Sequence, residues 1–183
     1  MTTELRRGFV LCLVALAIFG LAYPLAGTGL AQLLFPTQAN GSIGKYGSTL
    51  IGQQWSGPKW FHGRPDSDNP LKANGRPGTS GAANLGPRSK VLVSETSKLI
   101  RYWRRQGVTP TSDLVTTSGS GLDPDITPSD AIAQIPMVSS ATGIAPQRLR
   151  QLIRAQTVEP ELGFLGPAYV DVLKLNLALA RLR

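Results

Sequence analysis

The residues that could perform chemistry are few in this sequence. His62 is the one histidine and Cys12 the one cysteine among 183 residues. A histidine-based metal site or a Ser-His-Asp triad therefore has too few side chains to assemble. We expect His62 to be a surface or hydrogen-bonded residue and not a general base, and we predict no catalytic residues, no metal site and no directly bound cofactor. The chain is not expected to be an enzyme by itself.

The most unusual polar motif is the run Ser118-Gly119-Ser120-Gly121-Leu122-Asp123-Pro124. It lacks the Gly-x-Ser-x-Gly order of a nucleophile elbow. It also lacks the third glycine of a dinucleotide loop and the lysine of a phosphate-binding loop. We expect a tight turn with Gly121 at positive φ and with Asp123 accepting backbone N–H groups. Ligand binding at this motif remains the alternative.

An apolar segment contains Cys12 and precedes His62 and the glycine-rich run. From Gly8 to Phe35 the chain has no charged side chain, and these 28 mostly apolar residues are enough to cross a bilayer, even with a bend at Pro24. The prediction is an amino terminus at 1–7, a transmembrane helix at 8–35 and a soluble domain at 36–183. Side chains expected to anchor the helix are Phe9, Leu13, Leu16, Phe19, Pro24 and Leu33.

The flanks of this segment predict its orientation. Arg6 and Arg7 stand directly before it, whereas the first base after it is Lys45. Lys and Arg near a span stay on the cytoplasmic side. We therefore expect a single-pass membrane protein with a cytoplasmic amino terminus and an extracytoplasmic domain. A cleaved signal peptide, cut after Gly29-Leu30-Ala31, is the alternative, and it leaves the domain on the same side.

The composition of the chain excludes one class of partner. Its net charge is +8 and its pI is about 10.2, values that are common in nucleic-acid-binding proteins. Here the bases are dispersed, and no aromatic stacking pattern accompanies them. We therefore expect a membrane partner but no nucleic acid.

Residues 36–90 are rich in turn-forming pairs, which exclude long helices. Short strands are possible at Ser48 to Gln53 and around Trp60-Phe61, and most of the remainder is expected to be ordered loop. Trp55, Trp60 and Phe61 are expected to pin this loop to the domain. The turn-forming pairs are Asn40-Gly41, Gly57-Pro58, Arg64-Pro65, Asn69-Pro70, Arg76-Pro77-Gly78 and Gly86-Pro87.

Helices are predicted in the second half of the domain. Apolar spacing predicts one from Ser89 to Gln106, one from Thr127 to Thr142 that Pro136 breaks, and one from Pro146 to Gln156. Leu114 to Thr117 is expected to be a short strand. At the C-terminus, Asp171 can cap a helix over Val172 to Leu182, or Val170 and Val172 can belong to a strand. The fold class is therefore α+β, with one transmembrane helix, several further helices and a small sheet in a single loop-rich domain.

Six blocks of sequence, most of them in loops, follow one another in a pattern typical of one family. They are Asn40-Gly41-Ser42, Gly47 to Gln53, Phe61 to Pro65, Ser80 to Pro87, Asp113 to Pro124, and Leu162 to Gly166 together with Leu175 to Leu179. In this order the blocks resemble the C subunit of the bacterial Kdp-type potassium-transporting P-type ATPase, and the resemblance covers nearly the whole chain. It implies a location in the plasma (inner) membrane of a bacterium. Trp60-Phe61 and Met137-Val138 depart from the family's usual pairs.

The resemblance implies a non-catalytic accessory subunit of an ATP-driven potassium uptake complex. Its partners in that family are a channel-like potassium-binding subunit, a P-type ATPase subunit and a small lipid-associated peptide. Assembly is the expected role, and a catalytic chaperone that raises ATP affinity has also been proposed for the family. ATP and potassium would then be bound by the complex. Expected partner-docking residues are Gly52, Gln53, Arg64, Asn84, Ser118, Gly119, Gly121 and Asp123.

Two other classes of protein compete with this interpretation. An anchored extracytoplasmic enzyme needs a polar catalytic cluster, which the sequence does not display. A membrane-anchored extracytoplasmic solute-binding or regulatory domain needs a concave site, and the loops at 36–90 could supply one. Co-purification with a polytopic membrane protein separates the three classes.

Overall fold

An apolar helix begins the chain in the computed structural model, which describes residues 2–65 and 80–182. The helix is α-helical over α1 (Thr2–Ala15) and α2 (Tyr23–Leu34), and it widens to a π-helix, η1 (Leu16–Ala22), between them. Of the described helices, only this one is long and apolar enough to cross a membrane, by length and composition. The six side chains expected to anchor it are all exposed.

The π-helix explains how Pro24 is accommodated inside the helix. Proline removes one backbone donor and crowds the carbonyl four residues earlier. Just before it, the N–H of Tyr23 donates to the carbonyl of Ile18, five residues back. The sequence allows a bend at Pro24, and the structure has this wider π-helical turn just before it. The helix ends at Leu34, because Phe35 precedes Pro36 and leaves the helical conformation at φ −136°.

The chain divides into two compact units, Met1–Ser48 and Thr49–Arg183. Unit 1 holds the apolar helix, the short helix α3 (Pro36–Ala39) and a hairpin of β1 (Ile43–Gly44) with β2 (Gly47–Ser48). Residues 36–48 therefore belong to the same compact unit as the apolar helix. All of the chemistry-bearing motifs lie in unit 2.

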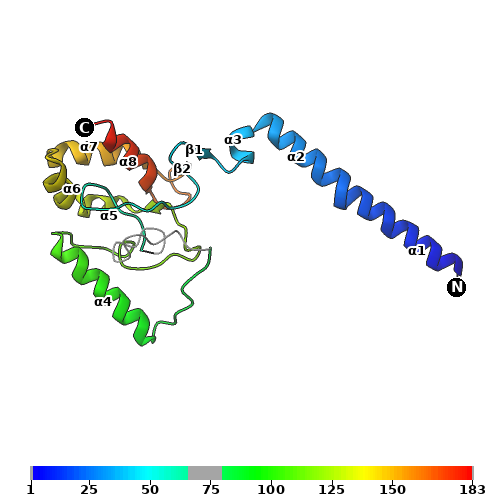
Figure 1. Cartoon of the computed structure of the whole chain (residues 1–183), viewed down its shortest axis with the longest axis horizontal. Helices are drawn as coiled ribbons and strands as arrows, with labels where there is room; N and C mark the ends of the chain where they lie inside the picture. The colour runs from blue at the N-terminus through cyan, green and yellow to red at the C-terminus, as the bar shows by residue number, and fades with distance from the viewer. Residues whose placement is uncertain (1, 66–79, 183) are drawn as a thin grey trace. The chain divides into compact units, whose positions relative to one another are not determined.

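Unit 2 is built from short elements (Figure 1). An antiparallel sheet has the order β3-β5-β4, with Asp125 paired with Asp171 and Thr157 paired with Val170. The small sheet and several helices confirm the α+β class. In chain order, the elements of unit 2 are α4 (Lys90–Arg105), β3 (Asp125–Ile126), α5 (Pro128–Ala133), α6 (Ile135–Thr142), α7 (Pro146–Gln156), β4 (Thr157–Val158), β5 (Tyr169–Asp171) and α8 (Val172–Ala180).

The helix boundaries follow the predicted capping residues. The side chains of Ser89, Thr127 and Asp171 accept hydrogen bonds from backbone N–H groups at the starts of α4, α5 and α8. The predicted break before Pro136 separates α5 from α6, and Gly143 ends α6 at φ 73°. Both C-terminal alternatives are partly right, because β5 leads directly into α8.

Three predicted strands are wrong or reduced. Only Ser48 of the segment 48–53 lies in a strand, and 60–61 forms none. Phe61 instead hydrogen-bonds through its backbone to the side chain of Asn176. Residues 114–117 form a turn, because the carbonyl of Ser112 accepts from both Val115 and Thr116. The predicted turns Asn69-Pro70 and Arg76-Pro77-Gly78 lie outside the described residues.

One apolar core holds unit 2 together, and the turn-rich segment is pinned to it as expected. Phe61 is fully buried in the core, and Trp55 and Trp60 pack against it. Trp103 is also fully buried, and its indole N–H donates to the carbonyl of Leu114 at 2.9 Å. Other fully buried members are Val138, Val170, Leu149, Leu175 and Leu179.

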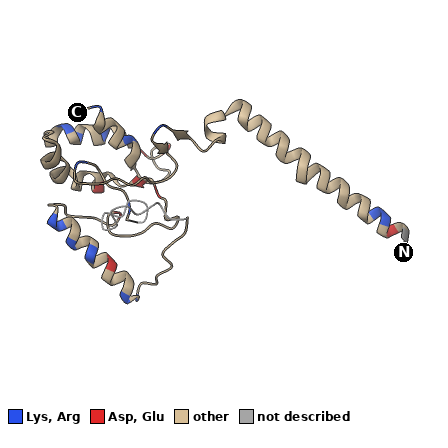
Figure 2. Ribbon diagram, viewed as in Figure 1, with Lys and Arg blue, Asp and Glu red and all other residues tan. Residues whose placement is uncertain are grey.

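Helix α4 enters this core only near its C-terminal end. Leu99 and Trp103 are its buried residues, whereas Val91 and Val93 are more than half exposed. Lys and Arg residues occur along its length (Figure 2). Arg104 and Arg105 in its last turn are exposed, as expected for cations near the C-terminus of a helix.

Candidate functional site

Arg64 lies at the centre of the loops that the sequence singles out. Its Nη1 donates to Oδ1 of Asp113 at 2.9 Å and lies 3.8 Å from a carboxylate oxygen of Asp123. Its Nη2 donates to the hydroxyl of Thr116 at 3.3 Å and to the carbonyl of Thr117 at 3.1 Å. One guanidinium thus joins three segments of chain, and only 18% of its side-chain surface is exposed.

Two buried aspartates extend this cluster toward α5. The Oδ2 of Asp113 accepts from the backbone N–H of Thr127 at 2.9 Å. The two oxygens of Asp130 accept from the N–H groups of Thr111, at 3.0 Å, and Asp113, at 3.1 Å. Charge-assisted bonds of this kind offset the cost of burying a carboxylate. These side chains are therefore committed to holding the chain's own backbone.

The glycine-rich run is the tight turn that the sequence predicts. Gly121 has φ +70°, and its N–H donates to the hydroxyl of Ser118 at 2.9 Å. The N–H of Gly81 donates to the carbonyl of Ser120 at 2.7 Å. A Cβ at Gly121 would lie 2.6 Å from the carbonyl oxygen of Gly81, so two backbone segments meet where only a glycine fits. Asp123 accepts from the N–H of Asp125, as expected.

The structure brings together most of the residues predicted to dock partners. The buried residue Gly52 joins the cluster, because its N–H donates to the carbonyl of Leu122 at 2.8 Å. Gln53 follows Gly52 and donates to the carbonyl of Ile51. Asn84 is exposed at φ 53°, and among the described residues no hydrogen bond joins it to the cluster. The residues gathered in the cluster are Gly52, Arg64, Ser118, Gly119, Gly121 and Asp123.

A small acidic cavity of about 300 Å³ opens beside Arg64, lined in part by Asp113, Asp123 and Asp125. Burial, followed by the charges of Asp171 and Asp123, raises the pKa of Asp125 to about 6, against an opposing effect of Lys174. Within the described residues, no group of three His, Cys, Asp or Glu side chains is arranged to hold a metal. With this raised pKa, Asp125 holds its proton to a higher pH than an ordinary aspartate does. The sequence analysis missed Asp125, whose only signal was its position beside Asp123-Pro124.

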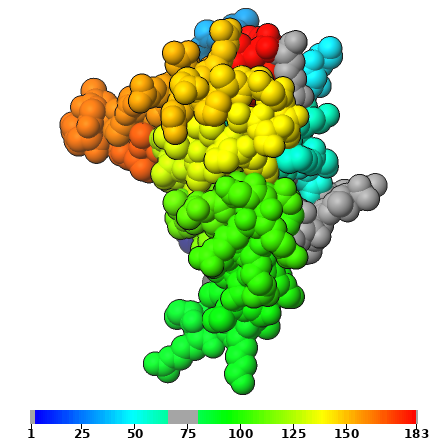
Figure 3. Space-filling view, turned by 90° about the vertical axis from the view of Figure 1, so that its left-hand side faces the viewer, coloured from blue at the N-terminus to red at the C-terminus, as the bar shows by residue number. Residues whose placement is uncertain are grey.

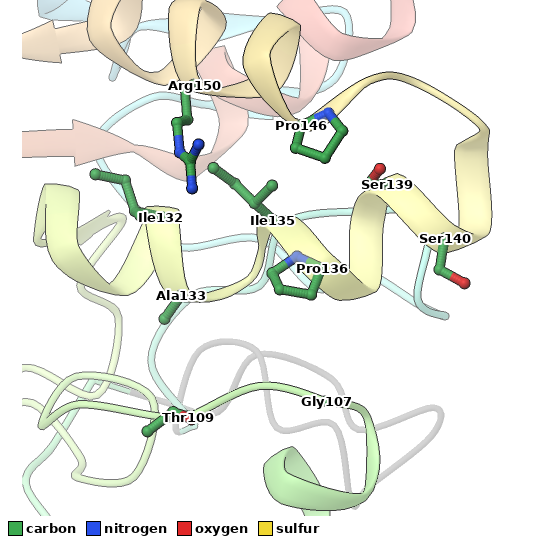
Figure 4. A pocket seen from close by; sticks show the side chains of 10 residues that line it. All are labelled: Gly107, Thr109, Ile132, Ala133, Ile135, Pro136, Ser139, Ser140, Pro146 and Arg150. Carbon is green, nitrogen blue, oxygen red and sulfur yellow. The ribbon is translucent and has the colours of Figure 1, made fainter.

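A larger groove of about 640 Å³ lies between the segment after α4, helices α5 and α6 and the start of α7. The side chain of Arg150 extends from α7 toward Ile132 and Ile135 (Figure 4). Pro136 and Pro146 supply further apolar surface. Such a groove suits apolar side chains with a nearby carboxylate.

His62 is structural, in agreement with the sequence analysis. It is 1% exposed, its Nε2 lies 3.1 Å from the carbonyl oxygen of Gly57, and its ring contacts Trp103 edge-on with centroids 5.5 Å apart. The backbone N–H of His62 donates to the side chain of Gln134 at 2.7 Å, and its carbonyl accepts from that side chain at 3.0 Å. These contacts hold the imidazole inside the core.

Comparison with known proteins matches almost the full chain. A family model described as K+-transporting ATPase, c chain, matches residues 5–181. The potassium-transporting ATPase KdpC subunit of Rhodopseudomonas palustris strain TIE-1 is 46% identical over 98% of this chain and 97% of its own. That of Methylobacterium nodulans is 43% identical over 100% and 98%. That of Gloeobacter violaceus is 46% identical over 90% and 88%.

Proposed function

Because the chain belongs to the family of the c chain of K+-transporting ATPases, we propose that it assembles and stabilises the other subunits of its complex. It is a subunit of a potassium-transporting ATPase. In this proposal it is non-catalytic: it binds no cofactor directly, and ATP and potassium are handled by its partners. Those partners are a channel-like potassium-binding subunit, a P-type ATPase subunit and a small lipid-associated peptide.

The observation that carries the proposal is that the charged side chains of the loop cluster bind other segments of the same chain. Arg64, Asp113 and Asp130, the charged groups best placed for chemistry, are hydrogen-bonded to the chain's own segments. A cluster of this kind fixes the shape of a loop surface, because these three side chains are taken up by contacts within the chain itself. A rigid loop surface is what an assembly subunit needs, because preorganised loops lose little entropy on docking.

Within this surface, the predicted docking residues divide into two roles. Gly52, Ser118 and Gly121 are buried and position the turn, whereas Gly119 and Asn84 are exposed and can contact a partner. Gln53, Arg64 and Asp123 lie between these extremes of burial. We propose that the exposed residues contact the partner and that the buried residues hold them in position.

The proposed topology places the amino terminus in the cytoplasm and unit 2 outside a bacterial plasma membrane. Support comes from Arg6 and Arg7 before the apolar helix and from the uncharged stretch after it. On that side of the membrane unit 2 does not meet cytoplasmic ATP. This favours assembly over direct nucleotide contact as the way in which the subunit acts.

The topology can be tested with single cysteines in a Cys12→Ala background. Ser94→Cys, on the exposed side of α4, should react with a membrane-impermeant thiol reagent in intact cells. The matched control Thr3→Cys should react only after the cells are broken open. Labelling in the reverse order would overturn the orientation.

The assembly role can be tested by affinity purification through the ATPase subunit. With this chain present, the channel-like subunit should be recovered at full yield, and without it the yield should fall several-fold. ATP hydrolysis per recovered complex should keep its KM for ATP. Normal recovery together with a raised KM for ATP would overturn assembly and favour the catalytic-chaperone role.

A further inference from the structure

The loop between β4 and β5 exposes three apolar side chains at its end. Leu162 is 83% exposed, Phe164 74% and Leu165 50%, and we call these three residues the apolar tip. In the space-filling view the orange segment that contains them stands out from the yellow helices of unit 2 (Figure 3). Single exposed apolar residues are ordinary, but three within four positions at the end of one loop form a patch.

The backbone beneath the apolar tip is closed and ordered. Glu161 and Leu165 exchange two backbone hydrogen bonds, at 3.0 and 2.8 Å, and Gly163 donates to the carbonyl of Pro160 at 3.0 Å. Leu162 has φ 53°, a left-handed conformation that leucine rarely adopts. A strained leucine on an exposed loop contributes nothing visible to the packing of unit 2. The strain therefore points to a contact outside it.

The charges around the apolar tip identify the kind of surface that it fits. No Lys or Arg occurs from residue 155 to 173, and the exposed Glu159 and Glu161 directly precede the tip along the chain. Peripheral proteins bind anionic bilayers with apolar side chains surrounded by Lys and Arg. An acidic surround is repelled by such lipids and attracted by a protein surface that carries bases.

We infer that the apolar tip inserts into an apolar socket, rimmed by Lys or Arg, on a partner subunit of the complex. The inference rests on the proposed function, which it deepens by naming the contact. A large aromatic side chain in a desolvated pocket, flanked by complementary charges, is the usual form of an energetically dominant contact. The ordered loop presents Phe164 for that contact with little left to order on binding.

Thiol protection in the intact complex tests the contact. In a Cys12→Ala chain, Phe164→Cys should react readily with a soluble maleimide when the subunit is free, and at least tenfold more slowly in the purified complex. Val91→Cys on α4, where Val91 is 57% exposed, is the matched control and should react equally in both. If Phe164→Cys alone prevents assembly, the contact is supported as well.

Equal reactivity of Phe164→Cys in the free chain and in the complex would overturn the inference while leaving the proposed function intact. Failure of the wild-type chain to assemble with any subunit would instead overturn the proposed function, and the contact with it. The two failures are therefore distinguished by the wild-type control.

Charge reversal tests the basic rim and the competing lipid surface. Glu159→Lys with Glu161→Lys should lower recovery of the complex several-fold, whereas Glu95→Lys on α4 should not. A fluorophore on Phe164→Cys should show no spectral shift with vesicles that contain phosphatidylglycerol. A shift there, strengthened by the two lysines, would assign the apolar tip to the membrane and overturn the proposed socket.

Discussion

Unit 2 contains two regions that invert the usual distribution of polar and apolar side chains. Beneath the loops, Gln134 and Asn176 are fully buried polar residues, whereas Leu162 and Phe164 at the apolar tip are almost fully exposed. The first region shows how a loop-rich domain satisfies its buried backbone. The second shows where the domain exposes apolar side chains to solvent instead of packing them in its core. Comparing them separates the residues that build the fold from those available for a partner.

The two buried side-chain amides satisfy backbone groups that would otherwise pair with a neighbouring strand. Asn176 accepts from the N–H of Phe61 at 2.9 Å and donates to its carbonyl at 2.8 Å. Gln134 forms the same pair of bonds with His62. Two side-chain amides thus pair four backbone groups that a neighbouring strand would otherwise satisfy. The fold can bury a long loop without enlarging its sheet.

The largest effect on stability should come from breaking one of these pairs. Asn176→Leu keeps the branched side-chain skeleton but leaves the N–H and the carbonyl of Phe61 buried without partners. Each such group costs about 1–3 kcal/mol, so the free energy of unfolding of unit 2 should fall by about 3 kcal/mol. Urea unfolding of the full chain in detergent, followed by tryptophan fluorescence, measures this loss because Trp55, Trp60 and Trp103 all lie in unit 2. A loss below 1 kcal/mol would show that the loop is held mainly by apolar packing.

A second prediction concerns the contact between two glycine-containing segments. Gly121→Val places a β-branched side chain at φ +70° and a Cβ at 2.6 Å from the carbonyl oxygen of Gly81. We expect a loss of about 2 kcal/mol in unfolding free energy and a lower recovery of the complex. Gly119→Ala is the matched control for stability, because a Cβ there meets no atom within 4 Å, and it should leave the unfolding free energy unchanged. A Gly121→Val chain that assembles in normal yield would remove the turn from the docking surface.

Local signals in the sequence identified most of the helices. Contacts between residues that are distant along the chain left no such signal. Ser89, Thr127 and Asp171 cap helices that begin at the next residue, so a few neighbouring positions suffice to place them. The partners of Phe61 and His62 lie 115 and 72 positions away, and nothing local indicates that amides replace a strand there. That is why 60–61 was predicted as a strand and why Asn176 was missed.

The same distinction applies to the candidate site. Gly121 was predictable because an isolated turn requires its backbone conformation. The roles of Asp113 and Asp130 depend on N–H groups that only the folded chain brings within reach. The exposure of the apolar tip was also not predictable, since Leu162 to Gly166 is as apolar as a core segment. Burial is a property of the whole fold, and sequence hydropathy does not report it.

A smaller effect should follow from the acidic cavity. Folding raises the pKa of Asp125 from its usual 3.8 to about 6, chiefly through burial. The folded state therefore binds this proton more tightly than the unfolded state does, and stability falls as pH rises from about 4 to about 6 and then levels off. Asp125→Asn should remove that slope and stabilise unit 2 at pH 7 by about 1 kcal/mol, since the carboxylate is only half buried. Urea unfolding at pH 4.5 and at pH 7 measures both values. An unchanged slope in Asp125→Asn would assign it to another carboxylate.

The smallest effect on stability should occur at the apolar tip, where a substitution is expected to stabilise unit 2 and not to destabilise it. Asparagine tolerates a φ of 53° better than leucine does, and the side chain of Leu162 is 83% exposed, so Leu162→Asn should raise the unfolding free energy by about 0.5 kcal/mol. The same substitution removes an apolar group from the proposed contact, and recovery of the complex should fall. Leu165→Asn is the control, because Leu165 lies in the same loop without a positive φ; it should weaken recovery without the gain in stability. If Leu162→Asn instead lowered stability and left recovery intact, the apolar tip would belong with the residues that build the fold.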